Sequence, residues 1–253
     1  MDALFGRLLS AHQVAWVETR VGISWKLDLS NATHRWIVYG YYEGYAFWRW
    51  FVMNRGNIRT VIDSGANIGQ TTLYFARLLS HARIFAYEPG CVAREWLSSC
   101  VKHNALGNVS IRNTGLGDGS RQAFLRSVGD STTHGSWNRI DDREGEAVQL
   151  IALDAEISRL GLNRIDLWKL DMEGGEIAAL KGADNALAGG LIGAIHVEMF
   201  AATGPIISQT LIGYGYRPFV SWHDRLVPAR ESFAYNGENI LFVHPLSGLR
   251  PPA

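Results

Sequence analysis

Residues 61–72, VIDSGANIGQTT, decide the fold of this 253-residue chain. The stretch is typical of a short apolar strand that ends in an acid, a turn that contains glycine, and the start of a helix. Glycine at positions 65 and 69 allows a sharp turn and a close approach of the backbone to a ligand, which a Cβ atom would prevent. The stretch therefore predicts a βα unit that binds a ligand at its turn.

A second predicted strand, Arg83 to Tyr87, ends in Glu88-Pro89. An acid at this position can accept hydrogen bonds from both hydroxyl groups of a ribose. The first acid, Asp63, distinguishes between cofactors, because it would repel a pyrophosphate over the turn but attract the sulfonium and ammonium groups of S-adenosylmethionine. The turn also lacks the G-x-G-x-x-G spacing of NAD-binding units. These features favour S-adenosylmethionine over NAD.

The composition indicates a globular α/β protein, with 47% hydrophobic and 19% charged residues. Lysine plus arginine equals aspartate plus glutamate at 24 each, which argues against nucleic acid as a partner. Cys91 and Cys100 have no nearby ligand cluster and are expected to be reduced thiols. The N-terminus lacks the layout of a signal peptide, and no apolar run reaches membrane-spanning length. We therefore expect a cytoplasmic protein without a membrane span.

The first 55 residues form a predicted N-terminal extension, or cap, on a compact domain of residues 56–253. Apolar residues at helical spacing predict an amphipathic helix over residues 3–17, and alternation predicts a strand over residues 24–29. Nine of the sixteen residues in 36–51 are aromatic. These rings could pack as a cap over the sheet, or could form the wall of an acceptor pocket, since flat rings stack on sugar faces.

The middle of the chain continues the βα alternation and then departs from it. A helix is predicted over residues 92–104 and a strand over residues 108–113. Asp118, in the turn after this strand, could accept a hydrogen bond from the adenine amino group or could simply serve turn formation. Residues 120–150 are polar and too long for an ordinary connection. We predict a loop there that recognises the acceptor through residues 131–134, which include His134, although solvent-exposed filler is the alternative.

Four further predicted strands complete a sheet of seven, at residues 165–171, 192–199, 216–220 and 239–243. A short helix opens at residue 153, and another helix is predicted over residues 176–187. Strands that alternate with helices imply a doubly wound, mostly parallel sheet, with helices on both faces and ligands at the carboxyl ends of the strands.

Acidic side chains lie at the ends of two of these strands. Asp171 ends the fourth strand, and Glu198 lies on the fifth, where it shares a face with His196. Lys169 shares a face with Asp171, so one interpretation is a structural ion pair between Lys169 and Glu198. The functional interpretation is that Asp171 or Glu198 contacts the cofactor, binds a cation or accepts a proton from the acceptor. His196 is interpreted as a core histidine.

The chain resembles the FkbM-type S-adenosylmethionine-dependent methyltransferases over roughly residues 61–243. The segment from Asp171-Met172-Glu173-Gly174-Gly175-Glu176 to Leu180-Lys181-Gly182 is the most diagnostic, because the motif at residues 63–69 is shared by many methyltransferases. The resemblance rests also on shorter matches: Tyr87-Glu88-Pro89, Asn104, Asn108-Val109, Gly117-Asp118, Leu153-Asp154 and Val197-Glu198. Gly175 and Gly90-Cys91 are small departures from the family pattern.

This resemblance implies a class I methyltransferase (Rossmann-like) fold with strand order 3-2-1-4-5-7-6 and an antiparallel last strand. It implies methyl transfer, usually to a hydroxyl oxygen on a sugar, a polyketide or a related metabolite. By position, it implies that the cofactor is bound by Asp63, Gly65, Asn67, Gly69, Glu88 and Asp118. The acceptor would then be a small molecule or glycan, and a homo-oligomer that buries the aromatic residues is compatible with the sequence.

The chemistry of such a transfer needs a nucleophile held in line with the methyl group. An alcohol is a weak nucleophile while protonated, so a base or a cation should assist. The candidates for the base are Asp171, His134 and Glu198, and Mg²⁺ could bridge Asp171 and Glu198. Two alternatives remain open: an NAD-linked dehydrogenase or epimerase, and a non-catalytic cofactor-binding module of a biosynthetic assembly.

Overall fold

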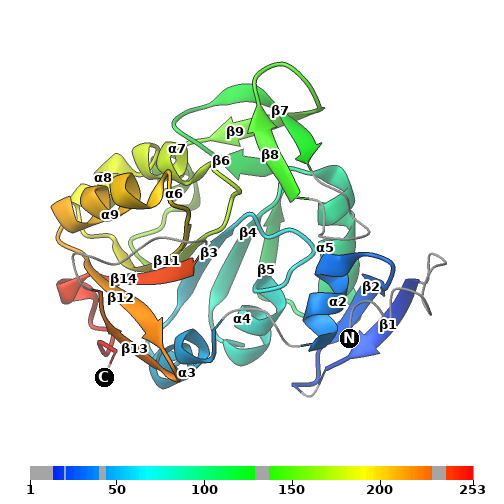
Figure 1. The fold of residues 1–253 in the computed structure, drawn as a ribbon, viewed down its shortest axis with the longest axis horizontal. Coiled ribbons are helices and arrows are strands. Elements are labelled where there is room, and N and C mark those ends of the chain that lie inside the picture. Colours follow the sequence, from blue (N-terminus) through cyan, green and yellow to red (C-terminus); the bar gives the residue numbers. More distant parts are fainter. Residues whose placement is uncertain (1–13, 20, 40–43, 129–136, 230–237, 253) are drawn as a thin grey trace.

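A computed structural model describes residues 14–19, 21–39, 44–128, 137–229 and 238–252. Its centre is a twisted sheet of eight strands, covered by helices, with a smaller sheet above it and a two-stranded hairpin beside it (Figure 1). Among the described residues, no helix combines the length and apolar character needed to cross a bilayer.

The large sheet has the strand order β13-β12-β14-β11-β10-β3-β4-β5. Pairing is parallel from β5 to β11, whereas β14 runs antiparallel to both β11 and β12. This confirms the expected order 3-2-1-4-5-7-6 with an antiparallel last strand. The strands are β3 (Thr60–Ser64), β4 (Arg83–Tyr87), β5 (Val109–Arg112), β10 (Ile165–Leu170), β11 (Ile192–Met199), β12 (Arg217–Trp222), β13 (Arg225–Pro228) and β14 (Glu238–Val243). The short edge strand β13 was not predicted, because its four residues carry no clear alternation.

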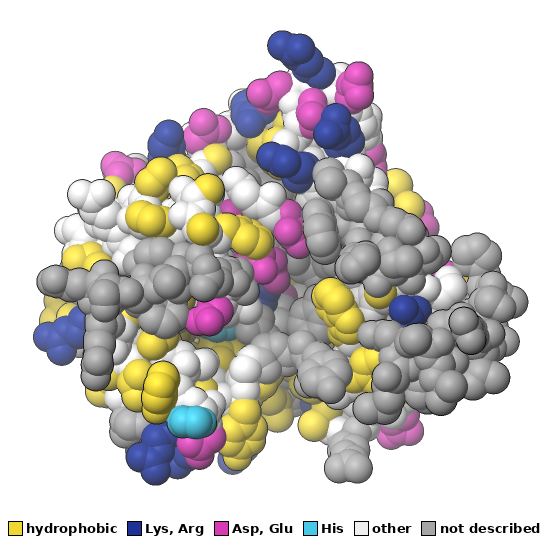
Figure 2. Space-filling model, viewed as in Figure 1, with side chains coloured by type: hydrophobic (Ala, Val, Ile, Leu, Met, Phe, Trp, Pro, Cys, Tyr) yellow, Lys and Arg dark blue, Asp and Glu magenta, His cyan; other side chains and the backbone are white. Residues whose placement is uncertain are grey.

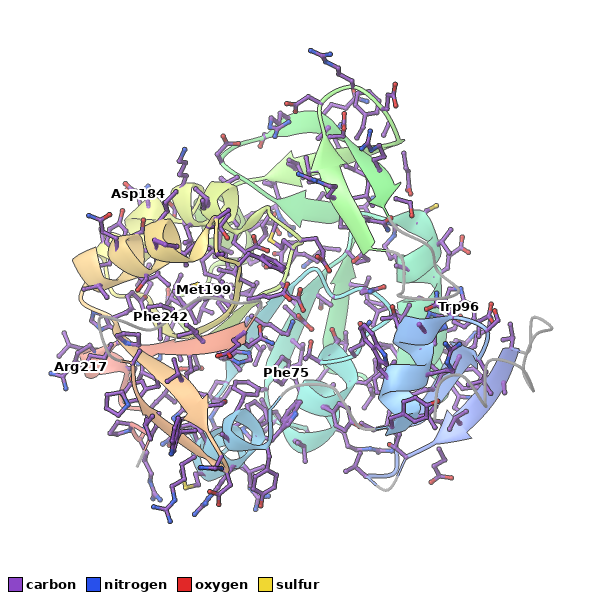
Figure 3. All side chains as sticks on the ribbon, in the orientation of Figure 1. Phe75, Trp96, Asp184, Met199, Arg217 and Phe242 are labelled. Carbon is purple, nitrogen blue, oxygen red and sulfur yellow. The ribbon has the colours of Figure 1, made fainter. Side chains whose placement is uncertain are left out.

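Helices cover both faces of this sheet, as predicted. One face is covered by α3 (Tyr45–Asn54), α4 (Thr72–Leu78) and α5 (Cys91–His103), and the other by α6 (Leu153–Leu160), α7 (Glu176–Lys181), α8 (Asp184–Ala188) and α9 (Gly204–Gly213). Two large clusters of buried apolar side chains separate these helices from the sheet. Phe75 belongs to the first cluster and Phe242 to the second (Figure 3). The chain continues after β14 into a single 3-10 turn, η1 (Pro245–Ser247).

The predicted helix over residues 176–187 is two helices, because the chain breaks at Gly182. A Cβ atom on Gly182 would lie 1.9 Å from the carbonyl oxygen of Gly117, so only glycine allows this close contact. The carboxylate of Asp154 then accepts hydrogen bonds from the backbone N–H groups of Asn185 (2.9 Å) and Ala186 (3.0 Å) at the start of α8. Two segments that carry the family resemblance, Leu153-Asp154 and Leu180-Lys181-Gly182, therefore stabilise the packing of these helices.

The N-terminal helix prediction is wrong for residues 14–17, which belong to strand β1 (Val14–Glu18). This strand pairs antiparallel with β2 (Ser24–Asp28), whose prediction is confirmed. Residues 3–13 lie outside the described part of the chain. The strand is favoured over a helix because every second side chain of β1 is partly covered. Trp16 also stacks on His103 of α5, with ring centroids 3.9 Å apart.

The N-terminal segment shares one apolar cluster with the large sheet. Trp25 of β2 and Phe47, Trp50 and Phe51 of α3 are at most 1% exposed and pack in the same cluster as Val61 of β3. Helix α2 (Ala32–Tyr39) precedes α3, and Tyr41 and Tyr42 lie outside the described residues. These buried rings pack as a cap over the sheet. The division into residues 1–55 and 56–253 stays a prediction.

The expectation of a loop over residues 120–150 is wrong for its described part. The described residues on either side of the gap at 129–136 form a second sheet of order β6-β9-β7-β8, made of β6 (Thr114–Leu116), β7 (Arg121–Val128), β8 (Trp137–Asp141) and β9 (Glu146–Ile151). Ala123, Leu125, Val148 and Leu150 form its small core. Polar residues alternate with these four, so the segment looks like a loop when only its composition is considered. Ser131 to His134 lie outside the described residues.

Candidate active site

A cavity opens at the carboxyl ends of β3, β4 and β10. Gly65 and Asn67 of the first turn, Glu88 after β4, and Asp171 after β10 all line it. In the space-filling view of Figure 2, acidic side chains reach a hollow near the middle of the face, below the small sheet. The turns that the sequence singled out thus meet at one site, as expected of a doubly wound sheet.

The first turn is shaped by its glycines. Gly65 has φ +77°, and a Cβ atom there would lie 1.8 Å from the carbonyl oxygen of Asp171. Gly69 has φ +100°, and a Cβ atom there would lie 2.3 Å from Leu73 of α4. The first glycine therefore lets β3 approach the loop after β10, and the second lets α4 start directly after the turn. Gly69 does not line the cavity, so its contribution to ligand binding is indirect.

Glu88 is buried at the cavity wall. Its carboxylate accepts hydrogen bonds from the backbone N–H groups of Asn67 and Gly90, both at 2.8 Å. Burial raises the pKa of Glu88 to about 7, and the two N–H donors and Arg94 oppose this shift. The carboxyl group is thus fixed in position and titrates near neutral pH.

Asp63 lies beneath the turn and does not line the cavity. Its side chain is 0% exposed, and Oδ2 accepts hydrogen bonds from the hydroxyl groups of Thr71 (2.9 Å) and Thr72 (2.6 Å). Burial raises its pKa, although nearby Lys169 opposes this shift. Oδ1 has no hydrogen-bond partner in the described part of the chain. Asp63 therefore anchors the first turn to the start of α4.

Gln70 is a site residue that the sequence analysis missed. It lines the cavity while only 4% exposed, and its amide nitrogen Nε2 has no hydrogen-bond partner among the described residues. Buried amide donors are rarely left unpaired unless a ligand or water completes them. Its place one residue after Gly69 was the signal available in the sequence.

The small sheet forms the far wall of the cavity. Leu125, Asn138, Ile140 and Leu150 line it from β7, β8 and β9. Described residues of the segment 120–150, which the sequence analysis assigned to acceptor recognition, therefore line the end of the cavity near Glu88. Asp118 is not among the lining residues: its side chain is 51% exposed and lies 3.7 Å from Nε of Arg121.

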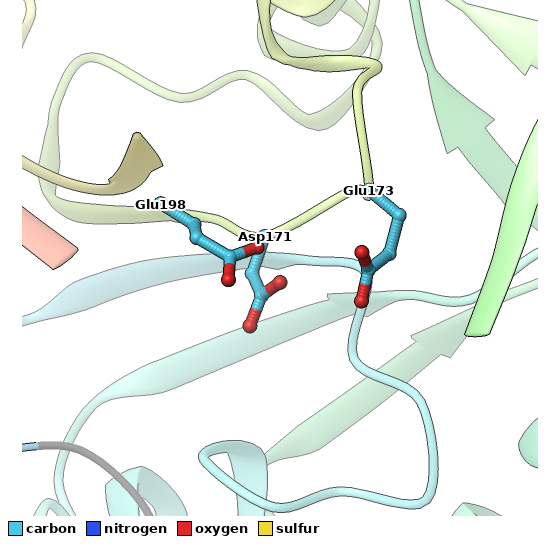
Figure 4. A group of neighbouring side chains, drawn as sticks. All are labelled: Asp171, Glu173 and Glu198. Atoms are coloured by element: carbon cyan, nitrogen blue, oxygen red, sulfur yellow. The ribbon is translucent and has the colours of Figure 1, made fainter. Parts of the chain in front are cut away.

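Three carboxyl groups converge at the other end, on the loop after β10 and on β11. Oxygen atoms of Asp171, Glu173 and Glu198 lie within 4.8 Å of one another (Figure 4). The loop carrying the first two is held by Glu176, whose carboxylate accepts hydrogen bonds from the N–H groups of Met172 and Gly174. Glu173 was missed in the sequence analysis, since its φ of +54° turns it towards the cluster in a way that spacing does not reveal.

Lys169 is the buried cation beside this cluster. Its Nζ donates to Oδ2 of Asp171 at 2.7 Å, so Lys169 forms an ion pair with Asp171. Burial, with Asp171 and Glu173 close by, raises the pKa of Glu198 well above its ordinary value. Burial, with Asp171 and Glu176 nearby, raises the pKa of Glu173 to about 7. The raised pKa of Glu198 favours its protonated form.

The structure describes His196, which was interpreted as a core residue, but not His134, which was a candidate base. His196 is 2% exposed and stacks on Phe47 with ring centroids 3.8 Å apart, and burial lowers its pKa well below the usual value. It is a core histidine, as interpreted. His134, the other candidate base, lies outside the described residues.

Cys91 and Cys100 are not joined in a disulfide.

The strand order and the cavity at the carboxyl ends of the strands define a class I methyltransferase fold. Residues 63–218 match the sequence model of the methyltransferase FkbM domain, and the chain belongs to this family.

Curated relatives match about half of this chain. It is similar to methyltransferase sdnD of Sordaria araneosa (32% identity over 158 residues, 49% of this chain and 60% of that protein). It is also similar to the AMB antimetabolite synthetase AmbE of Pseudomonas aeruginosa (30% over 163 residues, 50% and 8%). The match thus spans less than two thirds of either protein. A distant solved structure is the O-methyltransferase from Bacillus cereus in complex with SAH (16% identity, TM-score 0.42, 79% of this chain and 80% of that one).

Proposed function

We propose that this protein is an S-adenosylmethionine-dependent methyltransferase that acts on a hydroxyl oxygen of a sugar, glycan or glycosylated metabolite. The observation that carries the proposal is the convergence of Gly65, Asn67, Glu88 and Asp171 of the family motifs on one cavity.

The residues present fit the cofactor. The Glu88 carboxylate suits the ribose hydroxyl groups, and the apolar wall around Leu125, Ile140 and Leu150 suits an adenine ring. The unpaired amide of Gln70 offers a donor for the carboxylate of the methionine part. The carboxyl cluster at the other end provides negative charge near a sulfonium and an ammonium group. Asp118 stays a proposed adenine contact that requires movement of its exposed side chain.

The cofactor, when bound, supplies an already activated methyl group. The task of the protein is then to orient the acceptor hydroxyl and to take its proton. Asp171 is our first candidate for the base, because it lines the cavity and is held at 2.7 Å by Lys169. Burial and the neighbouring carboxyl groups raise the pKa of Glu198, so its protonated form is favoured and is better suited to hydrogen bonding with Asp171.

A divalent cation is an alternative use of the same carboxyl groups. Asp171 and Glu198 were the expected ligands, and Glu173 adds a third oxygen donor within 4.8 Å. Hard oxygen ligands suit Mg²⁺. A cation would replace the proton on Glu198 and would polarise the acceptor hydroxyl, so that either arrangement serves oxygen methylation.

Calorimetric titration with S-adenosylhomocysteine, and separately with NADH, tests the proposal. We expect saturable binding of S-adenosylhomocysteine alone, and we expect Glu88→Gln to weaken it. Binding of NADH alone would overturn the proposal in favour of an NAD-linked dehydrogenase or epimerase. A turnover assay over a pool of hydroxylated acceptors then addresses the other alternative, since S-adenosylhomocysteine binding without turnover would indicate a non-catalytic module. The two unbridged cysteines agree with a proposed cytoplasmic location.

A further inference from the structure

A second cavity lies at the opposite end of the same strands. It is lined by residues at the amino ends of β3, β4 and β10 and by the turns at residues 161–164 and 247–248. None of its lining residues belongs to the cofactor cavity, which opens at the carboxyl ends. Any ligand here would therefore be held apart from the methyl-transfer chemistry.

Three arginines line this cavity from three adjacent strands. Arg164 lies just before β10, Arg59 just before β3, and Arg83 is the first residue of β4. The N–H group of Arg83 donates to the carbonyl oxygen of Arg59 at 2.8 Å, so the two backbones are direct neighbours. Because neighbouring strands are about 4.8 Å apart, the three arginines start from backbone positions that span roughly 10 Å.

The one carboxylate in the lining is already used. Asp166 is 3% exposed, and its Oδ2 accepts hydrogen bonds from the N–H groups of Arg59 (2.7 Å) and Thr60 (3.0 Å). Its Oδ1 accepts from Nε of Arg164, whose Nη2 donates to the carbonyl oxygen of Ser247. The Arg164 guanidinium is thus held in place, with donors left over for a ligand.

The other two arginines carry uncompensated charge. In the described part of the chain no carboxylate lies within ion-pair distance of Arg59 or Arg83, and both residues are exposed. Arg83 is steadied by the ring of Phe85, 5.9 Å from its guanidinium carbon. Asn57 and Asn163 add neutral side-chain amides to the lining. In a chain with a formal net charge of zero, this is a local concentration of positive charge around a hollow.

We propose that this cavity is an anion-binding site for a small ligand that carries a diphosphate group. Guanidinium groups bind phosphate oxygens with paired, charge-assisted hydrogen bonds. Arginines on three adjacent strands, whose backbone positions span roughly 10 Å, can reach both phosphate groups of a diphosphate from different sides. The site would hold such a ligand without competition from the cofactor, so the proposal does not depend on the proposed methyl transfer.

Calorimetric titration of the full chain with pyrophosphate, and separately with orthophosphate, tests this site. We expect saturable binding of one pyrophosphate per chain, weaker binding of orthophosphate, and no displacement of pyrophosphate by S-adenosylhomocysteine. In the double variant Arg59→Gln/Arg83→Gln, pyrophosphate affinity should fall at least about tenfold, because each charge-assisted hydrogen bond lost weakens binding substantially. The exposed pair Arg139→Gln/Arg217→Gln removes the same charge elsewhere and should leave the affinity unchanged.

Four results would each overturn the proposal: absence of saturable pyrophosphate binding, an equal loss of affinity in both double variants, binding of orthophosphate as tight as pyrophosphate, or displacement of pyrophosphate by S-adenosylhomocysteine. Thermal melting of both double variants shows whether they are folded. A single Arg83→Gln variant serves as the second test if the double variant is unstable. Its affinity for pyrophosphate should also fall, but by less than that of the double variant.

Discussion

Replacement of Gly65 by alanine tests the close approach that shapes the active site. An alanine Cβ would lie 1.8 Å from the carbonyl oxygen of Asp171, whereas real Cβ atoms stay at least 3.0 Å from such an atom, so the two segments must separate by roughly 1.2 Å. Such overpacking costs about 1–3 kcal/mol. The φ of +77° adds the penalty of a left-handed conformation for an L-residue, about 1–2 kcal/mol.

The expected loss of unfolding free energy for Gly65→Ala is therefore about 2–5 kcal/mol. The hydrogen bond from the N–H group of Asp171 to the carbonyl oxygen of Ser64 (3.2 Å) should break as the segments part. Because Gly65 and Asp171 both line the cavity, affinity for S-adenosylhomocysteine should fall together with stability.

Urea denaturation followed by circular dichroism measures the first effect, and calorimetry with S-adenosylhomocysteine measures the second. Gly119→Ala is the matched control, because a Cβ atom at Gly119 meets nothing within 4 Å. Its unfolding free energy should stay within about 0.5 kcal/mol of the wild type. If Gly65→Ala behaves like this control in both assays, the packing of the first turn against the loop after β10 is wrong.

Three further predictions concern single carboxyl groups, and a fourth concerns a bound cation. Burial holds the pKa of Glu88 at about 7, above the ordinary 4.5, and ribose hydroxyl groups donate to the ionised form, so S-adenosylhomocysteine affinity should rise from about pH 6 to about pH 8. Calorimetry at these pH values measures it, and a rise that persists in Glu88→Gln would assign the titration to another group. Asp171→Asn should lower turnover at least about a hundredfold while cofactor affinity falls by much less, whereas an equal loss of affinity would make Asp171 chiefly a cofactor ligand. If enzyme that has been stripped of metal keeps its full turnover rate in the presence of a chelator, the cation arrangement is excluded. Asp154→Ala should cost about 1–2 kcal/mol in urea denaturation without affecting cofactor affinity, since Asp154 holds the start of α8, and the exposed Asp142→Ala should cost nothing measurable.

The strands of the large sheet were predictable because they are apolar runs with acids or turns at their ends. Residues 60–64 and 165–170 are buried at every position, which is the pattern of central parallel strands. Family resemblance then supplied the order of strands that local patterns alone cannot give. The positions of Glu88 and Asp171 at the cavity followed from the same geometry.

Tertiary contacts explain what the sequence analysis missed. The small sheet has a core of only four buried apolar residues, so its strands look polar until they are paired. Residues 14–17 fit helical spacing as well as alternation, and pairing with β2 decides between them. Asp118 and Lys169 show a second reason why sequence analysis falls short. A motif gives the position of a residue in the sequence, but not which neighbour its side chain contacts.

The place of β14 in the sheet has a consequence for biosynthesis. This strand lies between β11 and β12 and is made after both, so the sheet cannot be completed until residue 243 has left the ribosome. Until then two strand edges, including the one that carries Glu198, have no neighbour. Unpaired edges of this kind recruit other chains, so the nascent protein needs protection until its last strand is inserted.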